Sequence, residues 1–192
     1  MLLFLLLYRD IIRGLQPWKI WLILWLPVSL IFPASIIVFH PGGKMPRFMA
    51  DHMLGKTCKW MRIIGYDTLY PECKSDTEIL DKCILDDRIL LTRDYEFYKR
   101  YDKSIFLDSP DFKLQLKQIA KQFPPDRKLF FSRCPLCNNL LDEVDSRLMG
   151  PEFKDVMSRF SRVKYCTHCH KYYWNGSHYD KILTEIHAVL EG

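Results

Sequence analysis

Four of the seven cysteines form two C-x-x-C pairs, Cys134/Cys137 and Cys166/Cys169. Four thiolates in tetrahedral geometry are the typical ligands of a structural Zn²⁺ ion, and two such pairs at this separation are typical of a zinc ribbon. Two disulfides, or one redox-active pair, are the alternatives. Because four thiolates leave no open coordination position, we expect this metal to be structural. A thiolate metal site also indicates a reducing compartment.

Three aspartates, Asp51, Asp76 and Asp94, are each expected at the end of a strand or the start of a helix. Taken singly, each fits a solvated turn or a helix cap. If the strands are neighbours, the three carboxylates converge at one edge of a sheet. Mg²⁺ and Mn²⁺ prefer such oxygen ligands and activate water for phosphodiester hydrolysis. Asp108 and Asp111 are spare acids that could complete the site.

Residues 50–57, Ala-Asp-His-Met-Leu-Gly-Lys-Thr, fit a relaxed phosphate-binding loop with Ala in place of the first Gly. Such a loop needs glycine freedom, because successive backbone amides must curl around the phosphates. Here its interior is bulky, and Asp51 would bring the wrong charge. We therefore expect no nucleotide cofactor.

Cationic and aromatic residues suggest contacts to nucleic acid. Lys56, Lys59 and Arg62 recur at three-residue spacing on an expected helix, where they could bind phosphates beside the acidic residues. Trp174 follows the second cysteine pair and could stack on an unpaired base. The alternative for Trp174 is packing of the ribbon against the rest of the protein.

The elements that must position these residues follow from hydrophobic patterns. Short apolar runs alternate with helical patterns through residues 46–123, which predicts an α/β fold with a parallel sheet covered on both faces. The predicted strands are 46–50, 67–70, 88–92 and 104–107, and the helices are 54–64, 77–85 and 112–123. Active sites of such sheets lie at the carboxyl ends of the strands. The chain becomes loop-rich from Cys134 and ends in an amphipathic helix over 179–190.

Overall composition is that of a packed protein, with 192 residues, 48% hydrophobic, 27% charged and a net charge of +5. This excludes disordered, collagen-like and coiled-coil classes. Residues 20–39 carry no charge and are long enough to span a bilayer, although Pro27 and Pro33 would kink a helix. Residues 1–44 are therefore either a membrane anchor or non-native upstream translation before Met45. We expect a cytoplasmic location, with the remaining chain on the cytoplasmic side of any anchor.

Five segments resemble the Mut-7 C-terminal RNase domain family: PRFMADHMLGK (46–56), WMRIIGYDTLY (60–70), RILLTRD (88–94), RCPLCN (133–138) and YWNGSH (173–178). The resemblance implies a PIN-like nuclease domain, here residues 45–127, followed by a zinc ribbon with a C-terminal helix, residues 128–192. It implies that Asp51, Asp76 and Asp94 bind Mg²⁺ or Mn²⁺. Lys56 and Arg93 would then contact the RNA phosphates.

The expected function is that of a metal-dependent ribonuclease acting on single-stranded RNA, with the ribbon holding the RNA. One alternative is a non-catalytic RNA-binding protein with a zinc ribbon and a degenerate PIN-like fold. Another is a nucleotide kinase that uses Lys56 in its phosphate-binding loop. Cleavage that depends on Mn²⁺ distinguishes the first from the second, and the kinase predicts saturable ATP binding that depends on Lys56.

Overall fold

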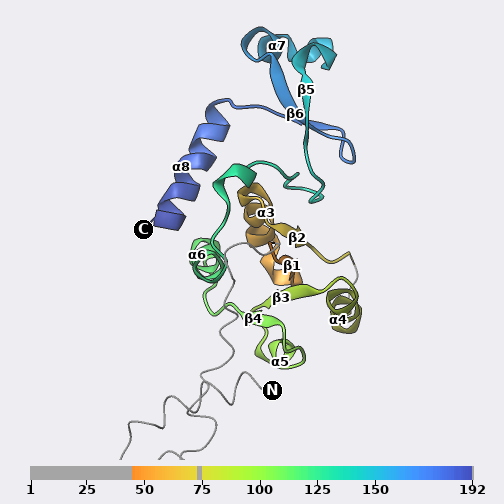
Figure 1. Ribbon diagram of the computed structural model, residues 1–192, viewed down its shortest axis with the longest axis vertical. Coiled ribbons are helices and arrows are strands. Elements are labelled where there is room, and N and C mark those ends of the chain that lie inside the picture. The colour runs from red at the N-terminus through yellow and green to blue at the C-terminus, as the bar shows by residue number, and fades with distance from the viewer. Residues whose placement is uncertain (1–44, 73–74, 192) are drawn as a thin grey trace, which may run out of the picture. The chain divides into compact units, whose positions relative to one another are not determined.

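The computed structural model describes residues 45–72 and 75–191. Its first half is built on a parallel sheet of four strands in the order β2-β1-β3-β4 (Figure 1). The strands are β1 (Arg47–Ala50), β2 (Asp67–Leu69), β3 (Arg88–Thr92) and β4 (Ser104–Phe106). From β1 the chain forms β2 on one side and then β3 on the other side. The direction in which strands are added therefore reverses between β1 and β3. In open α/β sheets, functional sites lie at this switch point.

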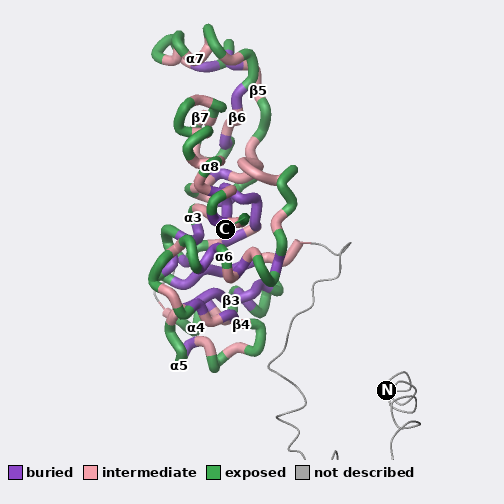
Figure 2. The backbone as a smooth tube through the Cα atoms, turned by 90° about the vertical axis from the view of Figure 1, so that its left-hand side faces the viewer, coloured by how far each residue is buried: buried purple, intermediate pink, exposed green. Residues whose placement is uncertain are grey.

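Helices cover both faces of this sheet. Helices α3 (Gly55–Ile64) and α6 (Phe112–Gln122) pack on the face that carries Phe48 and Leu91. Helices α4 (Asp76–Leu85) and α5 (Tyr95–Tyr98) pack on the face that carries Met49 and Leu90. Figure 2 shows the strands as largely buried, which explains why β3 is apolar at consecutive positions instead of alternating. The predicted α/β class, with a parallel sheet flanked by helices, is confirmed.

Local signals set the helix ends close to the predicted positions. Gly65 ends α3 with a φ of 102°, and a Cβ atom there would lie 2.5 Å from the carbonyl oxygen of Leu129. Only glycine satisfies both conditions. At α4 the N-cap is Ser75, whose hydroxyl accepts from the Glu78 N–H, so Asp76 is the first helical residue and not the cap we expected.

The cysteine-rich part forms a second sheet, antiparallel and in the order β5-β6-β7. Its strands are β5 (Asp142–Asp145), β6 (Arg162–Cys166) and β7 (Lys171–Tyr173), and the short helix α7 (Lys154–Arg159) lies between β5 and β6 in the chain. Helix α8 (Ser177–Glu191) then returns to the first half. Its Ile186 and Val189 join the hydrophobic core of α3 and α6, and α8 contacts α6 directly.

Hydrogen bonds connect the two halves around β2. The side-chain amide of Asn138 donates to Asp67, and its oxygen accepts from the Thr68 N–H. Arg88 also donates to the Asp67 carboxylate, at 2.8 Å. Burial would raise the pKa of Asp67, but the bonds from Arg88 and Asn138 outweigh it and lower that pKa. The Asp67 carboxylate therefore stays charged between the parallel sheet and the cysteine-rich part.

The predicted membrane anchor needs a correction. Within residues 45–72 and 75–191, no helix is long and apolar enough to cross a membrane. The longest helix there, α8, has 15 residues, against the roughly 20 that a bilayer requires. Residues 20–39, on which the prediction fell, lie outside the described residues. The predicted location, cytoplasmic with a possible membrane anchor, is therefore wrong for residues 45–72 and 75–191.

Candidate functional site

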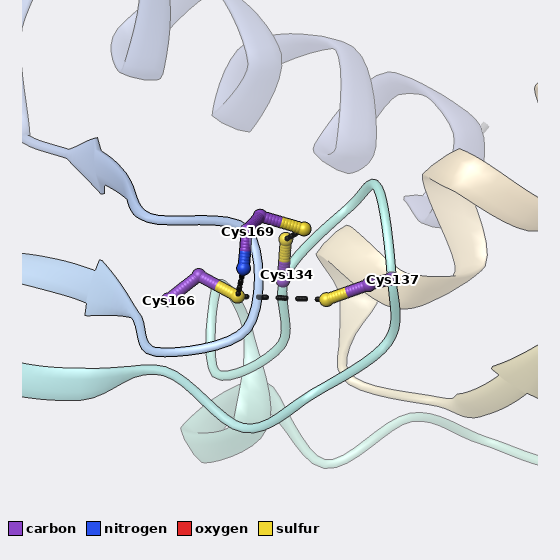
Figure 3. Close-up of side chains that lie close together, drawn as sticks. All are labelled: Cys134, Cys137, Cys166 and Cys169. Atoms are coloured by element: carbon purple, nitrogen blue, oxygen red, sulfur yellow. Dashed lines mark hydrogen bonds between the residues drawn. The ribbon is translucent and has the colours of Figure 1, made fainter.

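The four cysteines of the two C-x-x-C pairs come together in one cluster (Figure 3). Their sulfur atoms all lie within 4.8 Å of one another. The Sγ atoms of Cys137 and Cys166 are 3.5 Å apart, too far for a disulfide, and all four thiols are free. Within residues 45–72 and 75–191, this is the only group of three or more acidic, His or Cys side chains so arranged. The cluster could hold a metal ion such as zinc.

Hydrogen bonds favour the thiolate at Cys134, whereas burial raises the pKa of Cys166 and a hydrogen bond with Cys137 raises that of Cys169. The Cys169 N–H donates to the Cys166 sulfur at 3.3 Å, and the Tyr173 hydroxyl lies 3.3 Å from the Cys134 sulfur. Burial would raise the pKa of Cys134, but Tyr173 and the backbone N–H groups of Cys137 and Leu136 lower it to about 7. A thiol that ionises easily is a better metal ligand. The four thiolates fit Zn²⁺ in number and in chemistry.

A second polar cluster lies at the carboxyl ends of β1 and β3. Asp51 directly follows β1, is 5% exposed, and accepts a hydrogen bond of 2.6 Å from the Thr92 hydroxyl. The same hydroxyl accepts from the Asp94 N–H at 2.9 Å. The parallel register of β1 and β3, with Ala50 opposite Leu91, brings Asp51 next to Thr92. We call Asp51, Thr92 and Asp94 the acidic corner.

The carboxylates of the acidic corner are held by backbone donors. The Asp51 Oδ1 atom accepts from the His52 N–H, and the Asp94 Oδ1 atom accepts from the N–H groups of Glu96 and Phe97, which makes Asp94 the N-cap of α5. Asp94 is exposed. The cap uses one of its oxygens and fixes the direction of the other. Sequence reasoning offered a turn or cap role and a ligand role for Asp94 as alternatives, and this geometry accommodates both.

The third predicted acid, Asp76, lies apart from this pair. It begins α4, and its Oδ2 atom accepts from Arg100 at 3.1 Å. Its carboxylate forms no close ligand group with those of Asp51 and Asp94 among the described residues. Of the spare acids, Asp108 follows β4 one residue after Leu107, whose N–H donates to the Thr92 carbonyl, while Asp111 caps α6. The structure therefore joins Asp51 to Asp94 and leaves Asp76 paired with Arg100.

The cations expected to bind RNA occupy three different environments. Arg93, next to Asp94, has a buried Nε atom without a hydrogen-bond partner among the described residues. The Lys56 ammonium lies 3.9 Å from the centre of the Phe112 ring. Lys59 is exposed and lines a cavity, together with Trp174, which is 37% exposed.

Arg62 lies inside the protein, although we expected it to contact RNA. It is 6% exposed. Its guanidinium donates to the carbonyl of Thr68 at 2.8 Å and to those of Pro135 and Leu136 at 3.2 and 2.7 Å. The last two residues stand between the ligands of the first cysteine pair. Arg62 therefore holds that pair against α3 and β2, and its donors are used within the protein.

Sequence reasoning missed the central position of Thr92. The signal was present, because Thr92 ends β3 two residues before Asp94. A hydroxyl there can accept from the Asp94 N–H while donating to a neighbouring strand. The contacts of Asn138 could not be inferred, because its positive φ of 74° and its reach to β2 depend on tertiary packing.

Comparisons with known proteins identify the family. The comparison with curated proteins gave no match. The family model described as Mut7-C RNAse domain matches residues 46–186, a range that holds the acidic corner, the cysteine cluster and most of α8. The resemblance noted from the sequence is thus confirmed. By this match, which covers most of the sequence, the chain belongs to the Mut7-C RNAse domain family.

Proposed function

We propose that this chain is a metal-dependent ribonuclease that hydrolyses phosphodiester bonds of single-stranded RNA. In this proposal the parallel-sheet half is PIN-like, the cysteine cluster holds a structural Zn²⁺ ion, and the acidic corner holds Mg²⁺ or Mn²⁺. The family suggests a nuclease-like function. The observation that carries the proposal further is the sharing of one hydroxyl, that of Thr92, by Asp51 and Asp94 at the switch point of the sheet.

The chemistry of the acidic corner suits a hard cation. Mg²⁺ typically takes one or two carboxylates and fills its other positions with water and substrate phosphate. Asp51 and Asp94 are two such carboxylates, and the second is exposed toward solvent. When bound, the ion would lower the pKa of a water and neutralise charge on the phosphate. Asp76 would join as a third acid by exchanging Arg100 for the ion.

Neighbouring cations would position the RNA. Arg93 directly precedes Asp94, and a guanidinium recognises phosphate well. Lys56 lies in the first turn of α3, after the three-residue helix that follows Asp51. Water would attack phosphorus as the bond to the 3′ oxygen breaks. The products would carry a 5′-phosphate and a 3′-hydroxyl.

The test is cleavage of a fluorescent single-stranded RNA by the purified chain, with Mn²⁺ and without it. We expect Asp51→Asn and Asp94→Asn each to reduce the rate at least a hundredfold (about 3 kcal/mol of barrier), because each removes a charged ligand. Asp126→Asn is the matched control, since Asp126 is also an exposed helix cap but lies outside the acidic corner. Unchanged rates in both acidic-corner variants would refute the assignment.

A non-catalytic RNA-binding protein is the second candidate. The ion pair between Asp76 and Arg100 favours it, because that pair takes one acid away from the corner. This candidate predicts RNA binding without degradation at any Mn²⁺ concentration. If the chain cleaves RNA, Asp76→Asn tests the role of this acid: reduced cleavage assigns Asp76 to the metal site, and unchanged cleavage assigns it to the helix terminus alone.

A further inference from the structure

A cavity of ≈ 480 Å³ lies between α3, the first cysteine pair and the segment that joins β7 to α8. Helix α3 contributes Lys59 and Ile63, and the chain around the first cysteine pair contributes Arg133 and Pro135. The other wall is the segment from Tyr172 to Tyr179. The volume is that of a site for a small ligand. The cavity is distinct from the acidic corner, none of whose three residues lines it.

The cavity lining is cationic. It includes Lys59, Arg133 and Lys164 but no Asp or Glu. Lys59 forms no ion pair with any residue in 45–72 or 75–191, and Lys164 donates to the carbonyl oxygen of Phe131 at 2.8 Å. Arg133 lies 3.6 Å from the Asp67 carboxylate and donates to the carbonyl oxygen of Asn138 at 3.0 Å, and its Nε atom is buried without a partner among the described residues. The lining therefore has positive charge that an anion could neutralise.

The N-terminus of α8 adds to this positive potential. Gly176, Ser177 and His178 line the cavity at the start of a helix of 15 residues. The first N–H groups of a helix have no intrahelical acceptors and form a site for anions such as phosphate. Here the helix terminus and three cationic side chains line the same cavity. Together they fit the phosphate of a nucleotide.

Aromatic rings supply the other part of the lining. Trp174 and Tyr179 both line the cavity. Tyr179 packs on Phe131 with ring centres 4.2 Å apart, which fixes its position. Trp174 packs edge-on against Phe153, with ring centres 6.2 Å apart, and keeps 37% of its surface exposed. Its ring is therefore held in place but not covered. An exposed, supported indole beside cations is a typical stacking surface for an unpaired base.

We propose that this cavity binds one nucleotide of a single-stranded RNA, with the base stacked on Trp174 and a phosphate held by Lys59, Arg133 and the N-terminus of α8. The inference rests on the proposed function, since it names where that function's RNA would be anchored. An apolar peptide would leave Lys59 and Lys164, which form no ion pair with any described residue, without a counter-charge. A paired base cannot enter, because recognition of this kind requires a base splayed out of its helix.

Helix α3 links the cavity to the acidic corner. Lys56 and Lys59 are three residues apart, so they share a side of the helix and lie about 4.5 Å apart along its axis. Asp51 lies just before this helix. A strand anchored at the cavity could therefore continue over Lys59 and Lys56 toward the acidic corner. The anchored base would lie outside the scissile linkage and would set where along the strand cleavage occurs.

The test measures binding separately from cleavage. Fluorescence anisotropy of a labelled twelve-nucleotide oligouridylate is followed with the zinc-loaded full chain and no added Mg²⁺ or Mn²⁺. We expect Trp174→Ala to weaken binding about tenfold and Trp174→Phe to keep most of the affinity. Lys59→Gln should lower the slope of log affinity against log salt by about 0.7, the value for one phosphate contact to a single strand. Lys117→Gln, on the exposed side of α6, is the matched control and should bind as the unaltered chain does.

A second probe identifies the base as the stacked group. With an abasic oligomer of the same length, the unaltered chain and Trp174→Ala should bind equally. Zinc content is measured in every variant, and if Trp174→Ala loses zinc, Trp174→Phe and Lys59→Gln carry the test. Binding by Trp174→Ala and Lys59→Gln equal to that of the unaltered chain would overturn the cavity proposal. Cleavage at the full rate by both Asp51→Asn and Asp94→Asn would instead overturn the proposed nuclease, so the two failures are distinguishable.

Discussion

A single hydroxyl group organises the acidic corner. Thr92 donates to Asp51 at 2.6 Å and accepts from the Asp94 N–H at 2.9 Å, and its side chain is buried. The bond leaves the Asp51 carboxylate satisfied despite its burial, as a buried charge requires. A second bond, from the Asp94 N–H to the Thr92 hydroxyl, fixes the backbone where Asp94 follows β3. One side chain thus contacts both acidic residues.

Replacing this hydroxyl by a methyl group tests that dependence. Thr92→Val keeps the shape but leaves a buried Asp51 oxygen and the Asp94 N–H without partners, so we expect a loss of about 1–3 kcal/mol in the free energy of unfolding. Mn²⁺-dependent RNA cleavage should fall with it. Urea unfolding and initial cleavage rates measure the two effects. Thr92→Ser keeps the hydroxyl and should recover both, and a stable, fully active Thr92→Val would contradict this role.

At the scale of elements, α3 serves the two halves of the protein through two cations one turn apart, one exposed and one buried. Lys59 is exposed toward the cavity, whereas Arg62, three residues later, is buried and holds the carbonyls of Pro135 and Leu136. Hydrogen bonds around metal ligands fix the position of those ligands and raise affinity for the metal. Arg62 therefore acts on the cysteine cluster from outside it.

Arg62→Met should loosen the first cysteine pair. The change leaves three carbonyls without their donors, so we expect a loss of about 1–3 kcal/mol in stability and roughly tenfold faster zinc release. A chromophoric chelator follows the release. Lys59→Met is the control, since this residue has no hydrogen bond to the pair. Equal release rates for Arg62→Met and the unaltered chain would show that Arg62 does not support the metal site.

The contrast between Lys59 and Arg62 also marks the limit of sequence reasoning. Apolar runs predicted the four strands within a residue or two, because burial on both faces of a parallel sheet demands them. The paired spacing of the cysteines predicted their cluster. The three-residue spacing of Lys59 and Arg62 predicted that both contact RNA. Arg62 instead binds the loop of the first cysteine pair, and this contact could not be inferred because that loop is remote in sequence. Helix α5 was missed because its four residues are too few to show a period.

At the scale of the whole described chain, the cysteine-rich segment, residues 123–176, lies in the sequence between α6 and α8, two helices of the α/β core. The chain leaves after α6, forms β5, β6 and β7, and returns as α8, which contacts α6 and forms an ion pair from Glu185 to Lys113. The cysteine-rich segment has few buried hydrophobic residues of its own. Its buried hydrophobic residues between 130 and 176 are Cys134, Met149, Val163 and Cys166, two of which belong to the cysteine cluster. The sheet of β1–β4, in contrast, has hydrophobic clusters on both faces.

Removing zinc should therefore unfold the cysteine-rich segment and leave the parallel sheet of β1–β4 folded. A structural zinc ion supplies about 10–16 kcal/mol of binding free energy, and a segment with so few buried side chains cannot replace it. Helix α8 should persist, because Ile186 and Val189 are held by the core of α3 and α6 and not by the metal. Amide hydrogen exchange with a chelator present should show lost protection in β5, β6 and β7, and retained protection in β1, β3 and α8. Zinc added back should restore the pattern. Loss of protection throughout β1 and β3 would mean instead that the two halves fold as one cooperative unit, joined by the bonds of Arg62, Asn138 and Asp67.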